Sequence, residues 1–321
     1  MLPLSGSRHL HRSIGVVCAA LLLSACSSTT DVGHKDDKSE PEVTATPTMS
    51  LTVGLEFPLD AYEATQQERD AVEQGHNALV TQCMERFGFS YSPPQRPVTK
   101  AASGPNSRIF GLVDPKEAAQ YGYGSPGEPE PPAKTDKNLT ETEELALHGV
   151  PGLTPADMPM SQAEAEKKGG SKQKINGKAV PVGGCGREAF LKLYAPEPNA
   201  VDALYVFNLK SEAESKARED SRVKAVNKRW SECMAKQGHT AVDPMDARED
   251  LGIADDALSS PAAITAAKAD VACKQKVNLV GVYFAVQSAY QNRQINKNAE
   301  TLNLAKQQLK DRLKLAASLS S

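Results

Sequence analysis

The sequence lacks the patterns that mark most enzymes, nucleic-acid binders and membrane-spanning proteins. It contains no G-x-S-x-G, H-E-x-x-H, P-loop or EF-hand pattern, so no motif for nucleophilic, metal-assisted or phosphate chemistry is found. Aromatic residues make up only 5% of the chain, and none are interleaved with a stripe of Lys and Arg, which argues against nucleic-acid binding. After residue 26 no segment approaches the ~18 consecutive apolar residues of a spanning helix.

The first 26 residues have the organisation of a secretory leader. Arg8 and Arg12 precede an apolar run from Ile14 to Leu23, which at about ten residues is too short to span a bilayer but suits the apolar core of a signal peptide. The run ends in "LSAC" at residues 23–26, which resembles the bacterial lipobox. The resemblance implies that a diacylglycerol is attached to the Cys26 thiol, that palmitate-type acyl chains follow, and that the chain is cut before Cys26.

Cleavage there would remove residues 1–25 and leave membrane lipid as the partner of Cys26. Two or three acyl chains bind a bilayer far more firmly than one, so we expect a protein anchored to the outer face of the cell membrane. The leader carries Arg8 and Arg12 and no acidic residue, so the net charge of −3 falls to about −5 on cleavage, which opposes binding to nucleic acid. Residues 26–55 are rich in Ser, Thr, Pro and charge and are predicted to be a flexible tether.

Four cysteines remain after cleavage, and outside the cytoplasmic membrane they are expected to form disulfides. Three pairings are possible, and a repeat favours one of them. "CMERFG" (83–88) and "CMAKQG" (233–238) both read Cys-Met-x-x-x-Gly at the end of a helical segment, and each is followed by a loop and a second helical segment with a cysteine. This plan predicts the bonds Cys83–Cys185 and Cys233–Cys273. A zinc site is not expected, because the sequence shows neither closely spaced cysteines nor clustered histidines.

The pattern beyond residue 56 predicts an all-α, disulfide-stapled domain that extends to residue 321. Helices are expected over 60–87, with Asp60 and Glu63 as a capping box, and over 200–237, with a break near Asp220. Between them, residues 92–182 are rich in Pro, Gly and charge, and are predicted to be a loop-rich surface insertion with short capped helices.

A long C-terminal helix is predicted over 261–318. Its second half repeats apolar residues every seven positions, at Ile295, Leu302, Leu309 and Ala316, among Lys, Gln, Asn and Glu. Such a stripe needs a partner: its own chain, another copy, or an envelope protein. We therefore expect this helix to be a docking element.

Three aromatic residues are weaker candidates for binding. Trp230 is the only tryptophan and could stack against a ligand, although a position in the core is the more ordinary interpretation. Tyr121 and Tyr123 in "QYGYG" could form an exposed recognition patch or simply pack a loop against the domain. No catalytic residue, metal or cofactor is predicted.

Several segments together resemble a group of exported lipoproteins of high-GC Gram-positive (actinobacterial) bacteria. These are "ALVTQCMERFGF", "FGLVDPKEAAQYGYG", "GGCGREA", "RWSECMAKQG" and "ADVACKQKVNLVGVYFAVQSAYQNR", and the likeness covers residues 60–320 apart from 125–175. The resemblance implies an accessory protein of the cell envelope that works beside export or peptidoglycan-binding components, and it defines no catalytic residue.

The sequence thus predicts a membrane-anchored extracytoplasmic lipoprotein that acts as a non-enzymatic binding or assembly protein. The alternative is a ligand-sensing or solute-binding lipoprotein with a pocket near Trp230 and the insertion. Repeated strand–helix alternation, which a typical α/β solute binder would show, is missing.

Overall fold

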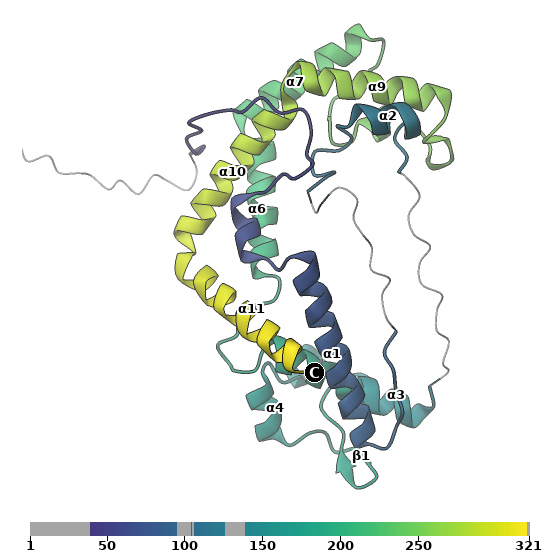
Figure 1. Ribbon diagram of the computed structural model, residues 1–321, viewed down its shortest axis with the longest axis vertical. Coiled ribbons are helices and arrows are strands. Elements are labelled where there is room, and N and C mark those ends of the chain that lie inside the picture. The colour runs from purple at the N-terminus through teal and green to yellow at the C-terminus, as the bar shows by residue number, and fades with distance from the viewer. Residues whose placement is uncertain (1–38, 95–103, 105, 126–138, 320–321) are drawn as a thin grey trace, which may run out of the picture. The chain divides into compact units, whose positions relative to one another are not determined.

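The computed structural model describes residues 39–94, 104, 106–125 and 139–319, and residues 40–321 belong to one compact unit. Most of these residues are helical (Figure 1), which confirms the predicted all-α fold. The leader, Cys26 and the start of the predicted tether lie outside the described residues. Among the helices described, none is both long and apolar enough to cross a bilayer.

The helices and strands follow one another along the chain with short connections. The α-helices are α1 (Gln66–Arg86), α2 (Pro115–Tyr121), α3 (Glu141–His148), α4 (Gln162–Lys168), α5 (Gly184–Tyr194), α6 (Tyr205–Glu219), α7 (Ser221–Lys236), α8 (Ala247–Asp250), α9 (Pro261–Lys276), α10 (Leu279–Lys297) and α11 (Ala299–Leu319). The shorter elements are the 3-10 helices η1 (Pro58–Tyr62), η2 (Pro155–Asp157) and η3 (Asp255–Ala257), and the strands β1 (Lys174–Ile175) and β2 (Lys178–Ala179), which pair antiparallel.

Two disulfides join helices in the predicted pairing. Cys83 of α1 bonds Cys185 of α5, and Cys233 of α7 bonds Cys273 of α9, with a Cα–Cα distance of 5.6 Å in both. The bonds thus link helix pairs of similar plan, as the repeated sequence pattern predicts.

The repeat extends to the hydrogen bonds that end α1 and α7. Phe89 N–H donates to Met84 C=O, and His239 N–H donates to Met234 C=O in the same relation. Both closures need a residue with positive φ, and Gly88 (φ 88°) and Gly238 (φ 82°) supply it. The same local chemistry therefore ends both helices at the same distance from a cystine.

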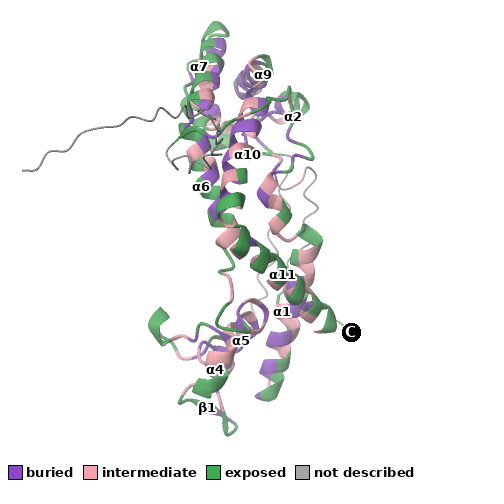
Figure 2. Cartoon of the chain, turned by 90° about the vertical axis from the view of Figure 1, so that its left-hand side faces the viewer, coloured by how far each residue is buried: buried purple, intermediate pink, exposed green. Residues whose placement is uncertain are grey.

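The buried apolar residues form two main clusters, and each cluster contains one of the disulfides. The first surrounds Trp230, Met234 and Tyr283 and includes Cys233 and Cys273. The second surrounds Val80, Met84 and Phe87 and includes Cys83 and Cys185. Figure 2 shows the buried residues along the inner faces of the helices.

The predicted flexible tether is wrong for residues 40–55, which lie against the helices. The Glu40 carboxylate accepts from Ser221 N–H at 2.6 Å and so caps the start of α7. Further along, Met49 N–H donates to the side chain of Asn278, and Thr52 is buried and bonds Ser107. Composition alone missed this, because the segment is fixed by polar capping and backbone contacts rather than by a regular apolar pattern.

The first long helix starts later than predicted. Residues 58–62 form η1, and α1 begins at Gln66 with Thr65 as its N-cap and Glu68 closing the capping box. Asp60 and Glu63 instead both bind the ammonium group of Lys210 on α6, at 2.7 and 2.6 Å. The acidic pair that suggested a helix start thus serves a tertiary ion pair.

Residues 261–318 are helical almost throughout, as predicted, but the helix is not continuous. Asn278 adopts the left-handed conformation (φ 54°) and separates α9 from α10. Its side-chain amide donates to Pro47 C=O at 2.9 Å, and the missing Cβ of Gly281 leaves space for the same carbonyl. A second break at Asn298 separates α10 from α11.

The insertion contains the predicted short helices, with Asp114, Thr140 and Ser161 as side-chain N-caps. It is not confined to the surface, however. Phe110 belongs to the first cluster and Ala146 to the second, and both are almost fully buried. Helix α2 packs on α9, and α3 packs on α5, so this part of the chain completes both cores.

Candidate functional site

The apolar stripe that was predicted to dock a partner is covered by the protein's own chain. Leu302 is fully buried and packs with Leu59 and Leu209, and Ile295 contacts the same cluster. Leu309 is half-buried. Ala316 meets α1 so closely that a Cβ added at Gly75 would lie 2.8 Å from its Cα. The prediction of an open docking stripe is therefore wrong, because α11 folds back on α1.

Trp230 is fully buried in the first cluster and is not available to stack on a ligand. Its indole N–H donates to Asp270 Oδ1 at 2.9 Å. The predicted pocket near Trp230 is thus replaced by packed side chains. The ordinary interpretation, a core tryptophan with its polar edge satisfied, is the correct one.

Asp270 is the centre of a buried polar cluster that joins three parts of the fold. Its carboxylate lies 3.2 Å from the ammonium group of Lys274, one helical turn later on α9. The same ammonium donates to Leu112 C=O at 3.1 Å, and Tyr123 O–H donates to Asp270 Oδ2 at 3.4 Å. The cluster therefore ties α7, α9 and the 112–123 segment together.

Burial dominates the electrostatics of this cluster. It raises the pKa of Asp270, although Lys274, Trp230 and Tyr123 act in the opposite direction. It lowers the pKa of Lys274, against the attraction of Asp270. The pKa of Tyr123 is raised by burial and by the Asp270 charge. Asp270 and Lys274 each expose 1% of their surface or less, so the arrangement holds segments together and offers no access to a substrate.

The predicted tyrosine patch is only half exposed. Tyr123 packs its ring against the first cluster while its hydroxyl points to Asp270. Tyr121 is half-buried, and its carbonyl accepts from Ser259 Oγ at 2.8 Å. The two tyrosines fasten the loop after α2, as the alternative interpretation of "QYGYG" had it.

Sequence reasoning missed the Asp270–Lys274 pair. A carboxylate and an ammonium four residues apart are most often a solvent-exposed pair on a helix. The signal was the register: Asp270 lies one turn from the cystine residue Cys273 and shares the inner face with Ala263 and Ala266, which are buried. A charge pair in the apolar register of a helix indicates a buried ion pair.

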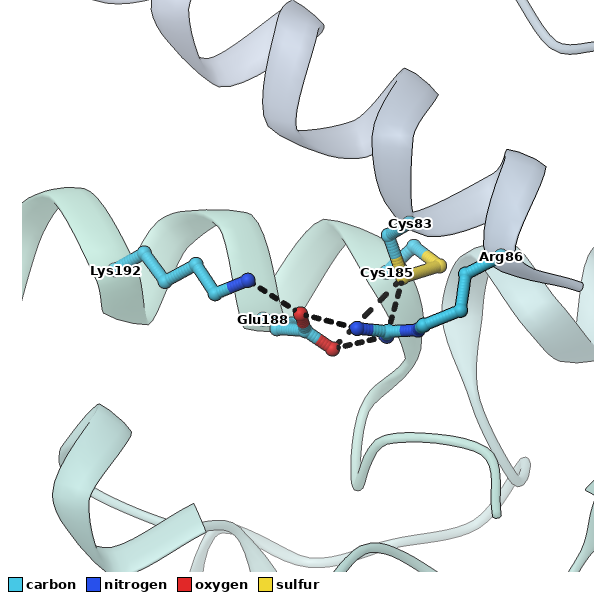
Figure 3. Close-up of a disulfide and its surroundings, with 5 residues drawn as sticks. All are labelled: Cys83, Arg86, Cys185, Glu188 and Lys192. Atoms are coloured by element: carbon cyan, nitrogen blue, oxygen red, sulfur yellow. Dashed lines mark hydrogen bonds and ion pairs between the residues drawn. A yellow bond between two sulfur atoms is a disulfide. The ribbon is translucent and has the colours of Figure 1, made fainter. Parts of the chain in front are cut away.

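The Cys83–Cys185 bond lies beside a second charged group, shown in Figure 3. The Arg86 guanidinium donates to Cys83 Sγ at 3.1 Å and makes two hydrogen bonds to the Glu188 carboxylate, at 2.6 and 3.1 Å. Lys192 binds the same carboxylate at 2.7 Å. Burial acts to raise the pKa of Glu188, but the hydrogen bonds from Arg86 and Lys192 outweigh it, and the pKa lies below its ordinary value. This group reinforces the contact between α1 and α5.

An open groove of about 360 Å³ lies over the other disulfide, Cys233–Cys273. It is the best candidate for a binding site in the described part of the chain, where no group of three or more His, Cys, Asp and Glu side chains could hold a metal. The residues that line it, besides the two cysteines, are Gln237, His239, Thr265, Lys268, Ala269, Ala272 and Lys276. No acidic side chain is among them.

Comparison with known proteins adds no name to this site: no family model, curated protein or solved structure matches the chain.

Proposed function

We propose that the chain is an exported lipoprotein, anchored through acylated Cys26 to the outer face of the cell membrane, that acts as a non-enzymatic binding or assembly protein of the envelope. The observation that carries the proposal is the pair of disulfides, each of which joins two helices of a repeated unit. Disulfides of this kind persist in oxidising compartments. The lipobox-like "LSAC" at residues 23–26 supports the anchor.

The tether in this proposal is short. Because Glu40 already caps α7, only residues 27–39 remain between the anchor and the packed part of the chain. That length spans at most about 45 Å when fully extended. The protein would therefore act close to the bilayer surface.

A binding role fits the site better than catalysis does. The charged pair with perturbed pKa values, Asp270 and Lys274, is enclosed and hydrogen-bonded within the fold. The groove over Cys233–Cys273 is open and lined by polar groups that are suited to holding a ligand. It favours the second candidate, a ligand-binding or ligand-sensing lipoprotein, with the ligand beside the disulfide rather than beside Trp230.

Fatty-acid labelling tests the anchor. Cells expressing the full chain are fed an alkyne-tagged palmitate analogue, and the protein is recovered from the membrane fraction. We expect Cys26→Ser to abolish labelling and Cys18→Ser, the matched control in the leader, to keep it. Equal labelling of wild type and Cys26→Ser would contradict the proposal.

The assembly role needs a separate test that leaves the fold intact. Truncation of α11 is unsuitable, because this helix packs on α1. Native electrophoresis of gently solubilised membranes asks instead whether the 34.3 kDa chain migrates in a larger complex that chemical crosslinking preserves. Migration as a single acylated chain would refute the assembly role and favour the ligand-binding candidate.

A further inference from the structure

We propose that the groove over Cys233–Cys273 binds a phosphate-type anion, either as free phosphate or as the phosphate of a lipid headgroup. This inference rests on the ligand-binding form of the proposed function and names the chemical class of its ligand. The chain holds 40 acidic residues, yet the groove is lined by Lys268, Lys276 and His239 without a carboxylate. Such a lining attracts an anion in a protein whose overall charge is negative.

One face of α9 forms one side of the groove. Thr265, Lys268, Ala269, Ala272 and Lys276 follow one another at intervals of three or four residues, so their side chains emerge on the same side of the helix. The alanines are short and leave the floor open between the two ammonium groups. The disulfide beneath them holds α9 against the end of α7.

The opposite side comes from the turn that ends α7. Gln237 and His239 flank Gly238, whose positive φ turns the chain at this point. The backbone N–H groups of Gln237 and His239 both donate to Met234 C=O, which leaves their side chains for the groove. An amide N–H and a ring N–H are suitable donors to a phosphate oxygen.

The lysines have no competing partner within the described residues. Neither Lys268 nor Lys276 forms an ion pair there, whereas Lys192, Lys210 and Lys216 each bind a carboxylate. Lys276 ends α9, where a cation stabilises the helix dipole in any case. Lys268 lies in the middle of the helix and has no such structural role, so it is the more diagnostic of the two.

Lysine footprinting tests the inference on the full chain with its disulfides intact. Acetylation rates of individual lysines are measured by mass spectrometry in sodium phosphate and in sodium chloride at equal ionic strength. A second arm compares vesicles of phosphatidylglycerol and phosphatidylcholine with vesicles of phosphatidylcholine alone, because the acyl chains would place the protein on both. Lys116 and Lys172, exposed and without an ion pair, serve as internal controls.

We expect phosphate or the anionic vesicles to slow acetylation of Lys268 and Lys276 about two- to fivefold relative to the controls, the range for exposed charge pairs. Protection by phosphate identifies the free anion as a ligand, and protection by anionic vesicles alone identifies the headgroup. Lys268→Gln should remove the protection of Lys276, and Lys116→Gln should not. Unchanged Trp230 fluorescence would show that both variants fold.

Equal rates at all four lysines in both arms would overturn the inference, as would protection that survives Lys268→Gln. The phosphate arm does not depend on acylation. Failure of the groove and failure of the Cys26 anchor are therefore separate results.

Discussion

Replacement of Asp270 by asparagine would leave the ammonium group of Lys274 buried without a counter-charge. Both side chains are inaccessible to solvent, and the two charged groups lie 3.2 Å apart. Removing one partner of such a pair costs about 3–5 kcal/mol of unfolding free energy. Asparagine retains an oxygen that can accept from Trp230, so the loss would report the missing charge rather than a missing acceptor.

A surface pair of the same spacing provides the matched control. Glu212 and Lys216 on α6 are also four residues apart and in contact at 2.7 Å, but both are substantially exposed. Glu212→Gln should therefore cost no more than about 0.5 kcal/mol. The double variant Asp270→Asn/Lys274→Met should be more stable than Asp270→Asn alone, because only the Leu112 carbonyl then lacks its donor, at about 1–3 kcal/mol.

Urea unfolding followed by the fluorescence of Trp230 is the appropriate assay, since this is the only tryptophan in the chain and it bonds Asp270 directly. The cost of Asp270→Asn should shrink as pH rises. The pKa of Lys274 is already lowered by burial, so alkaline pH removes the uncompensated charge. If Asp270→Asn costs no more than Glu212→Gln, or if its cost grows with pH, the account of this cluster is wrong.

Three further predictions concern the other contacts that hold the helices. Gly75→Val should destabilise the protein by about 1–3 kcal/mol, because a side chain there meets Ala316 at 2.8 Å; a melting temperature equal to wild type would count against the α1–α11 contact. Replacing Cys83 and Cys185 together by alanine should cost about 5 kcal/mol in the chain-entropy model for a separation of 102 residues, measured by the same unfolding assay. The pKa of Glu188 is lowered in the fold, so its ion pairs stabilise above the ordinary value of 4.5 and are lost as pH falls through the lower folded value. Glu188→Gln should flatten this acid dependence in thermal melts across that range, and an unchanged slope would refute the assignment.

The features that local sequence chemistry determines were predicted correctly. The two Cys-Met-x-x-x-Gly segments indicated which cysteines pair, and the same capping hydrogen bonds end both helices. Asp220 was expected near a helix break, and it both ends α6 and caps α7. Caps and glycine closures are encoded within a few residues, so the sequence displays them directly.

Long-range contacts between polar groups were not predictable in the same way. The position of residues 40–55 depends on Asn278, more than 200 residues later, and nothing near the segment indicates it. The heptad stripe of α11 correctly indicated a helix with a buried face, but periodicity does not say which surface covers that face. Here it is α1 and η1, so the binding candidate moves to a groove that has no sequence signature.

Mass spectrometry of the protein recovered from membranes, without reduction, tests the account as a whole. We expect the mature chain to begin at Cys26, to carry acyl groups on that residue, and to yield peptides crosslinked as Cys83–Cys185 and Cys233–Cys273. A chain that still begins at Met1, without lipid and with free thiols, would contradict it.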